Sequence, residues 1–157
     1  MERIYLTQEG YDNLYQELEH LKNVSRREIS KKIAEARALG DLSENAEYHA
    51  AKETQGQIEA KISALEDKLS RAEIIKEEDI SLDKVRIGVK VTLQDLNTQN
   101  QFFYVLTSDE EANYEENKIG INSPIAQALL GKERNTTVSV KVPAGTLTYK
   151  ITNISLP

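Results

Sequence analysis

Two acidic residues, Asp41 and Glu44, lie three positions apart in a short polar stretch of the first half of the chain. Carboxylate oxygens are ligands that Mg²⁺ prefers in proteins. Two exposed carboxylates hold this ion weakly, because Mg²⁺ gives up water reluctantly and a solvated turn leaves most coordination positions to water. If the pair serves a metal-dependent reaction, we expect a partner to complete the site, with no metal bound by the chain alone.

A purely structural role fits the same residues. Asp41 and Glu44 have a variant of the capping-box spacing, and Ser43 between them is a good N-cap for a following helix. Ser43 could instead contribute a hydroxyl to a site at this turn, and Asn45 could support the turn in either case. The pattern alone does not decide between capping and chemistry.

Long helices are expected on both sides of this stretch. From Thr7, a suitable N-cap, to Ile75 the apolar residues recur at helical spacing and no proline occurs. Steps of three and four are typical of coiled-coil seams. The seam residues are Tyr11, Leu14, Leu18 and Leu21 before the polar stretch, and Ile58, Ile62, Leu65, Leu69 and Ala72 after it.

Pairing the two seams as an antiparallel hairpin locates the turn. Four seam pairs, of which Leu14 with Leu69 is one, have residue numbers that add up to 83, and the midpoint falls between 41 and 42. Gly40 suits the end of the first helix there. Each arm of roughly 30 residues extends about 45 Å. The seams predict a hairpin with Asp41 and Glu44 at its tip, and a monomer, because they satisfy each other within one chain.

After residue 78 the apolar period changes from helical to two. Residues 85–93, 137–142 and 147–151 alternate as half-buried strands do, and 101–107 and 118–121 predict two more. Ser123, Pro124 and Gly131 suit the N-cap, first position and end of one helix. We therefore predict an α+β protein of two domains, with a coiled-coil hairpin at 1–76 and a small antiparallel β-sheet domain with one helix at 77–157.

The composition of the chain limits the kinds of partner that we expect. The net charge of −6 disfavours free nucleic acid, because phosphates repel an acidic chain, although local basic patches can still form. The chain has no cysteine, which excludes a thiol metal site and agrees with a reducing compartment. Neither a signal peptide nor a membrane-spanning stretch is evident. We expect a cytoplasmic protein with no membrane partner.

The turn resembles the tip signature of the GreA/GreB family of transcript-cleavage factors over residues 40–51, GDLSENAEYHAA. The next residues, KETQG at 52–56, favour the GreA branch over the GreB branch. Residues 121–132, INSPIAQALLGK, resemble the family's C-terminal signature. The resemblance covers essentially the whole chain in the same order. A match of this length is more specific than an isolated Asp-x-x-Glu, and it favours chemistry over capping.

The resemblance implies a factor that enters the secondary channel of bacterial RNA polymerase and stimulates endonucleolytic cleavage of backtracked nascent RNA. Such a factor is an accessory to the polymerase and not an enzyme. Asp41 and Glu44 match the family's catalytic acidic pair, and would help to hold a second Mg²⁺ and the attacking water beside the ion that the polymerase holds. The second domain is implied to be an FKBP-like module that docks on the rim of the channel.

Basic residues follow the expected arms near the tip. By the pairing rule Lys52 comes level with Lys31, and Arg27 lies one turn further from the tip. Solvated or ion-paired helical side chains are one interpretation. The other is a basic patch that guides the RNA 3′ end, which the resemblance implies for Arg37 and Lys52 and which would make stimulation salt-sensitive.

Three other functions fit parts of the pattern. A channel-binding inhibitor is one, but related factors of that kind have altered acidic tips, whereas Asp41 and Glu44 are both present here. A structural coiled coil would need no special chemistry at these residues. Prolyl isomerisation would need an aromatic-lined pocket in the second domain, where we expect five aromatic residues to fill the core instead: Phe102, Phe103, Tyr104, Tyr114 and Tyr149.

Overall fold

The computed structural model describes residues 2–41 and 44–157. The chain divides into two compact units, Met1–Glu2 with Tyr11–Ala72, and Arg3–Gly10 with Glu73–Pro157. Helices form the first and a sheet dominates the second, which confirms the predicted fold class. The expected domain division after residue 76 stays a prediction. In the described part of the chain, no helix is long and apolar enough to cross a membrane.

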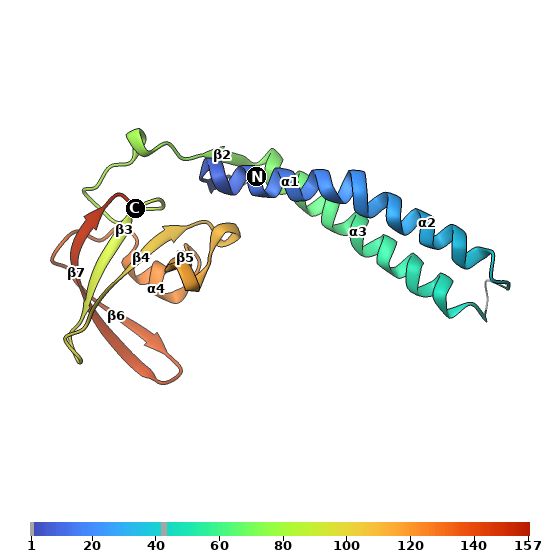
Figure 1. The fold of residues 1–157 in the computed structure, drawn as a ribbon. Coiled ribbons are helices and arrows are strands. Elements are labelled where there is room, and N and C mark those ends of the chain that lie inside the picture. Colours follow the sequence, from blue (N-terminus) through green and yellow to red (C-terminus); the bar gives the residue numbers. More distant parts are fainter. Residues whose placement is uncertain (1, 42–43) are drawn as a thin grey trace. The chain divides into compact units, whose positions relative to one another are not determined.

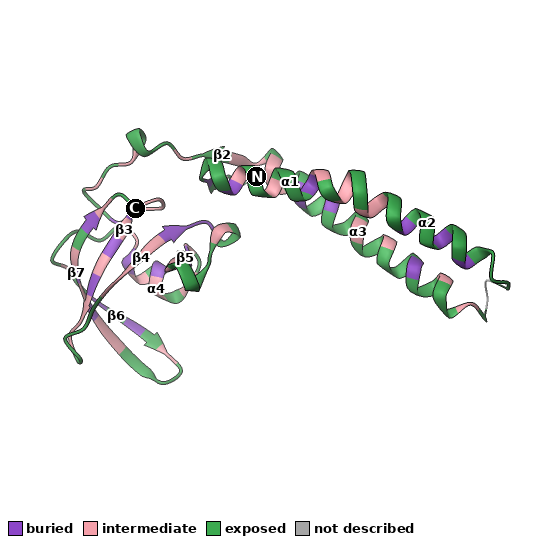
Figure 2. Cartoon of the chain, viewed as in Figure 1, coloured by how far each residue is buried: buried purple, intermediate pink, exposed green. Residues whose placement is uncertain are grey.

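The first unit is an antiparallel helical hairpin (Figure 1). Its first arm consists of α1 (Gln8–His20), a π-helix (Leu21–Ser25) and α2 (Arg26–Arg37), and its second arm is α3 (Ala46–Ser70). The first turn of α1 belongs to the second unit. Most outward-facing positions of the hairpin are exposed (Figure 2). The predicted seam is confirmed from Leu14 to Leu69, with Leu18, Ile62 and Leu65 buried and Leu14, Leu21, Ile58 and Leu69 packed against them. Its last predicted residue, Ala72, is not helical, because α3 ends at Ser70 and Ala72 begins a short strand.

The π-helix places one extra residue in the first arm. At regular coiled-coil spacing the seam would continue from Leu21 to residues 25, 28, 32 and 35. The buried residues lie one position later, at Ile29, Ile33 and Ala36. A π-helical turn holds an additional residue, so it absorbs the insertion and keeps the seam facing α3. The sequence pattern predicted one continuous α-helix here and missed this insertion.

Two ion pairs join the arms beside the π-helix. The ammonium of Lys22 lies 2.8 Å from a carboxylate oxygen of Glu66. Arg26 donates from Nε and Nη2 to the two oxygens of Glu59, at 2.8 and 2.9 Å, and this hydrogen bonding lowers the pKa of Glu59. All four side chains are at least one-third exposed, so water screens each pair and their contribution to stability is small.

The second unit contains a five-stranded sheet of order β5-β4-β3-β7-β6. The strands are β3 (Lys90–Asp95), β4 (Gln101–Thr107), β5 (Lys118–Gly120), β6 (Thr137–Val142) and β7 (Gly145–Ser155). All neighbours are antiparallel except β4 and β5, so the sheet is mixed and not purely antiparallel as predicted. Two short strands, β1 (Ile4–Leu6) and β2 (Ala72–Ile74), form a separate pair.

The predicted strand at 85–93 is wrong in its first half. Gly88 has a φ of +96°, a conformation that side chains other than glycine rarely adopt, and the chain turns there before β3 begins at Lys90. Val85 instead exchanges backbone hydrogen bonds of 2.8 Å with Gly131 and Lys132. The alternation of apolar residues in this segment therefore reflects two buried loop residues, Val85 and Val89, that precede the strand.

The core of the second unit lies between the sheet and α4 (Pro124–Leu129). Ala126 and Leu129 of the helix are fully buried with Leu93, Leu106 and Ile151 of the sheet. The predicted cap of α4 is confirmed, because the amide of Ala126 donates to Ser123 Oγ at 3.2 Å and Pro124 occupies the first turn.

The expectation that five aromatic residues fill this core is wrong for two of them. Phe102 packs edge-to-face against Tyr104 and Tyr149, with ring centroids 5.4 and 5.1 Å apart. Burial raises the pKa of both tyrosines. Tyr114 is 72% exposed, and Phe103 alternates with its neighbours and lies on the opposite face of the sheet.

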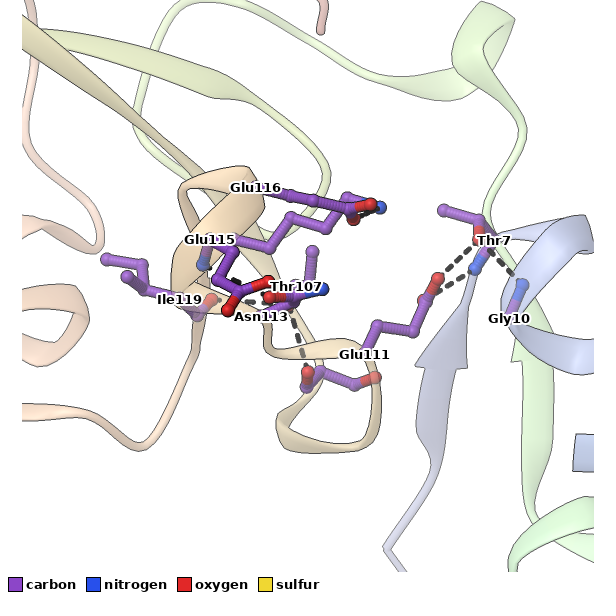
Figure 3. A network of polar contacts seen from close by, with 10 residues as sticks. Thr7, Gly10, Thr107, Glu111, Asn113, Glu115, Glu116 and Ile119 are labelled. Atoms are coloured by element: carbon purple, nitrogen blue, oxygen red, sulfur yellow. Dashed lines mark hydrogen bonds and ion pairs between the residues drawn. The ribbon is translucent and has the colours of Figure 1, made fainter. Parts of the chain in front are cut away.

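The N-terminal segment is joined to the second unit by Glu111 (Figure 3). Its carboxylate accepts from the backbone amide of Thr7 at 2.9 Å and from Thr7 Oγ1 at 2.5 Å. The same Thr7 oxygen accepts from the amide of Gly10 at 3.0 Å, which confirms Thr7 as the N-cap of α1. A Cβ atom at Gly10 would overlap the end of the Glu111 side chain, which would have to move away from Thr7 to make room.

Candidate functional site at the hairpin tip

The structure places Asp41 and Glu44 between the end of α2 and the start of α3, at the tip of the hairpin (Figure 1). Both residues are exposed. Gly40, with a φ of +135°, precedes Asp41 and lets the chain leave α2 in a conformation that other residues rarely adopt. Ser43 lies outside the described residues, so its expected role as a cap or hydroxyl donor stays a prediction.

Asn45 joins the two helix ends at the tip. Its side-chain amide donates to the carbonyl oxygen of Ala36 at 2.6 Å, and its side-chain oxygen accepts from the backbone amide of Tyr48 at 3.0 Å. The first bond satisfies a carbonyl in the last turn of α2, and the second satisfies an amide in the first turn of α3. One side chain therefore bonds to both helix ends.

This arrangement bears on the capping interpretation of the acidic pair. The N-cap of α3 is Asn45, and the residue at the third helical position, where a capping box has glutamate, is Tyr48. Asp41 and Glu44 both precede this cap. The N-cap of α3 is thus a residue other than the two carboxylates, both of which are exposed.

Arg37 also lies at the tip. Its guanidinium carbon is 5.7 Å from the ring centroid of Tyr48, a distance suited to a cation–π contact. Tyr48 packs beneath the turn against the buried cluster of Ile29, Ile33 and Ala51. The contact holds the Arg37 guanidinium near the Tyr48 ring at the hairpin tip, and the sequence pattern had not indicated it.

The other predicted basic residues lie along the exposed faces of the arms. Lys52, on α3, donates from Nζ to the side-chain oxygen of Gln55 at 3.1 Å. Arg27 and Lys31 are exposed on α2. Because the π-helix shifts the pairing by one position, Lys32 instead of Lys31 comes level with Lys52. Lys32 lines a hollow of about 360 Å³ between α2 and α3.

The donor set at the tip suits a hard cation but does not complete a site. The described residues contain no cluster of three or more acidic or histidine side chains that could hold a metal ion. Asp41 and Glu44 supply oxygen ligands of the type that Mg²⁺ prefers, and the ion usually binds proteins through one or two carboxylates together with phosphate oxygens and water. The residues fit half of a shared site.

Comparisons with known proteins match nearly the whole chain to transcription elongation factors. Residues 4–74 match the family model described as transcription elongation factor, N-terminal, and residues 79–156 match transcription elongation factor, GreA/GreB, C-term. A curated transcription elongation factor GreA of Chloroherpeton thalassium is 48% identical over 99% of this chain and 98% of its own length. GreA of Neisseria meningitidis serogroup B is also 48% identical, covering 98% of each chain.

Two solved structures are similar over nearly their full length. The GreA factor homolog 1 (Gfh1) of Thermus thermophilus is 31% identical, with a TM-score of 0.46 over 98% of this chain and 99% of that chain. A GreA/GreB factor from Nitrosomonas europaea is 18% identical, with a TM-score of 0.44 over 99% of each chain.

Proposed function

The chain belongs to the GreA/GreB family of transcription elongation factors, accessory proteins that stimulate the transcript-cleavage activity of RNA polymerase, and we propose that its hairpin carries Asp41 and Glu44 into the polymerase active site. The hairpin would enter through the secondary channel, and the substrate is backtracked nascent RNA. The observation that carries this proposal is the pair of exposed carboxylates at the tip, next to a helix start that Asn45 already caps.

The exposure of the pair supports a site that is completed by the polymerase. A Mg²⁺ ion shared by the two proteins would neutralise charge on the phosphodiester and lower the pKa of a bound water. Asp41 and Glu44 would each offer a carboxylate oxygen to that ion or to the water. Asn45 would hold the ends of α2 and α3 together, so that the two carboxylates enter in a fixed geometry.

The basic residues near the tip would guide the RNA. Arg37 lies at the tip near the Tyr48 ring, and Lys52 is the seventh residue of α3. Both are exposed, as are Arg27 and Lys31. Electrostatic attraction of these side chains to RNA phosphates would weaken with added salt. The second unit would dock on the polymerase at the rim of the channel.

The test uses a stalled, backtracked bacterial polymerase complex with Mg²⁺. The parent protein should release short 3′ RNA fragments, whereas Asp41→Asn and Glu44→Gln should lose most of this stimulation and still bind the polymerase. Glu53→Gln, which neutralises an exposed carboxylate on the same arm, is the matched control. Binding of the parent protein without fragment release would instead indicate a channel-binding inhibitor.

A further inference from the structure

The register of the sheet in the second unit separates its residues into two faces. Residues paired across antiparallel strands point to the same face. Val91 and Leu93 of β3 share one face with Tyr104, Ile151 and Ile154 of the neighbouring strands, and this face holds the core and α4. The residues that alternate with them form the opposite face, which we call the open face. Its members are Lys90, Thr92, Gln94, Gln101, Phe103, Val105, Lys118, Thr137, Ser139, Lys141, Thr146, Thr148, Lys150, Asn153 and Ser155.

The open face is positively charged, although the chain as a whole is acidic. It includes four lysines and no carboxylate. The only acidic residue in the five strands, all of which are described, is Asp95. Asp95 is paired with Tyr149 on the core side, and its carboxylate accepts from the amides of Asn97 and Thr98 in the following turn.

One of the four lysines is neutralised. The ammonium of Lys118 lies 3.1 Å from a carboxylate oxygen of Glu116, and this hydrogen bond raises the pKa of Lys118. The remaining lysines, Lys90, Lys150 and Lys141, lie on three adjacent strands. They carry the charge of the open face.

These three lysines form a straight diagonal row. Lys150 of β7 is paired with Gln94, which lies four residues after Lys90 in β3. On its other side Lys150 is paired with Thr137 of β6, and Lys141 lies four residues after Thr137. At about 3.4 Å per residue and ~4.8 Å between strands, successive lysines are roughly 14 Å apart. Hydroxyl and amide side chains fill the intervals. Charges in a spaced line suit a linear polyanion better than a compact acidic surface.

An aromatic ring lies at one end of the row. Phe103 is half-buried on the open face, and the ammonium of Lys90 lies 4.3 Å from its ring centroid. A phosphate that drew this ammonium away would leave the ring available for a base, since aromatic side chains on a sheet are common stacking sites for unpaired bases.

We propose that the open face binds a single-stranded nucleic acid, with phosphates at Lys90, Lys150 and Lys141 and a base on Phe103. The second unit would then hold a strand through a surface separate from the hairpin tip. A duplex would leave Phe103 without a stacking partner, because an aromatic ring cannot stack on bases that are paired within a helix.

The test is fluorescence anisotropy of a labelled 12-nucleotide oligouridylate with the full chain at low salt. The slope of log Kobs against log salt should be about −2, since each phosphate contact on a single strand contributes about −0.7. Replacing all three lysines with glutamine should weaken binding at least about tenfold and abolish most of the slope. Phe103→Thr should weaken binding about fivefold or more, with an unchanged slope.

Two control variants make the outcome specific. Lys84→Gln with Lys132→Gln removes two exposed lysines of the same unit outside the sheet and should leave binding unchanged. Arg37→Gln with Lys52→Gln removes the tip charges, and in this background the three lysine replacements should still weaken binding at least about tenfold, so failure here is distinct from failure of the transcript-cleavage proposal. The inference would be overturned if the oligouridylate did not bind, or if only the tip variant lost binding. It would also be overturned if a duplex or polyglutamate bound as tightly as the oligouridylate.

Discussion

The side chain of Asn45 donates to the carbonyl oxygen of Ala36 at 2.6 Å, across the turn that separates the two arms of the hairpin. The same side chain caps α3 through Tyr48. A single residue thus fixes the spacing of the helix ends between which Asp41 and Glu44 lie.

Replacing Asn45 should test this relationship through stability. Asn45→Ala removes a cap, worth about 0.5–2 kcal/mol, and a second hydrogen bond worth about 1 kcal/mol. Asn45→Asp keeps the acceptor for Tyr48 but loses the donor to Ala36, so its loss should be smaller. Urea unfolding followed by circular dichroism at 222 nm would measure both. Equal stability of the parent protein and Asn45→Ala would show that the tip is held by other contacts.

Because the π-helix holds one extra residue, we expect the hairpin to tolerate the deletion of one residue there. Removing Asn23 should restore regular spacing between Leu21 and the seam residues of α2, so the hairpin should stay folded with little loss of stability. Removing Lys31, the control, displaces Ile33 and Ala36 from the seam. That deletion should cost on the order of 2–5 kcal/mol, as other losses of buried packing do. Thermal melting of the two variants compares them directly, and equal losses would contradict the role of the π-helix.

Gly10 and Glu111 should be energetically coupled. A Cβ at Gly10 would overlap the end of the Glu111 side chain, so Gly10→Ala should displace that carboxylate from Thr7 and destabilise the protein by about 0.5–1.5 kcal/mol in the parent background. In a Glu111→Ala background the overlap is gone, and the same change should be nearly neutral or slightly stabilising within a helix. A double-mutant cycle from denaturant unfolding measures the coupling. Additive effects would indicate that Glu111 does not occupy this position in solution.

Alkaline pH should weaken the second unit through its buried tyrosines. Burial raises the pKa of Tyr104 and Tyr149 above the ordinary value near 10, so the folded state favours the protonated phenols. The stabilisation that this preference gives the folded state is fully present below the pKa of tyrosine in the unfolded chain. It is lost as the pH rises through the pKa values of the two tyrosines in the folded protein. Stability measured from pH 8 to 11 should fall less steeply in Tyr104→Phe than in the parent protein. An identical pH profile would argue against this assignment.

The spacing of apolar residues predicted the helical hairpin because two long apolar seams determine where its helices pack. Leu14, Leu18, Leu65 and Leu69 located the hairpin and its turn, and Ser123 located α4. The π-helix was missed because the residues just after Leu21 are mostly polar. The one-residue shift of the seam becomes visible only at Ile29, where apolar seam residues resume. The parallel pairing of β5 could not be read from a three-residue strand.

The residues of the candidate site stay a prediction from the sequence, and the contacts among them could not be predicted from it. The acidic pair and Asn45 were evident from the turn signals and the family resemblance. The bond from Asn45 to Ala36 and the packing of Arg37 over Tyr48 were not, because they join helices across the hairpin and depend on side-chain directions. The two aromatic residues outside the core, Phe103 and Tyr114, were misassigned because composition alone does not show which face a strand residue occupies.

Cleavage of backtracked RNA by the polymerase in the presence of Asp41→Asn tests the central claim most directly. We predict that this variant binds the polymerase as the parent protein does and loses most of the fragment release. Normal fragment release by Asp41→Asn and by Glu44→Gln would contradict it.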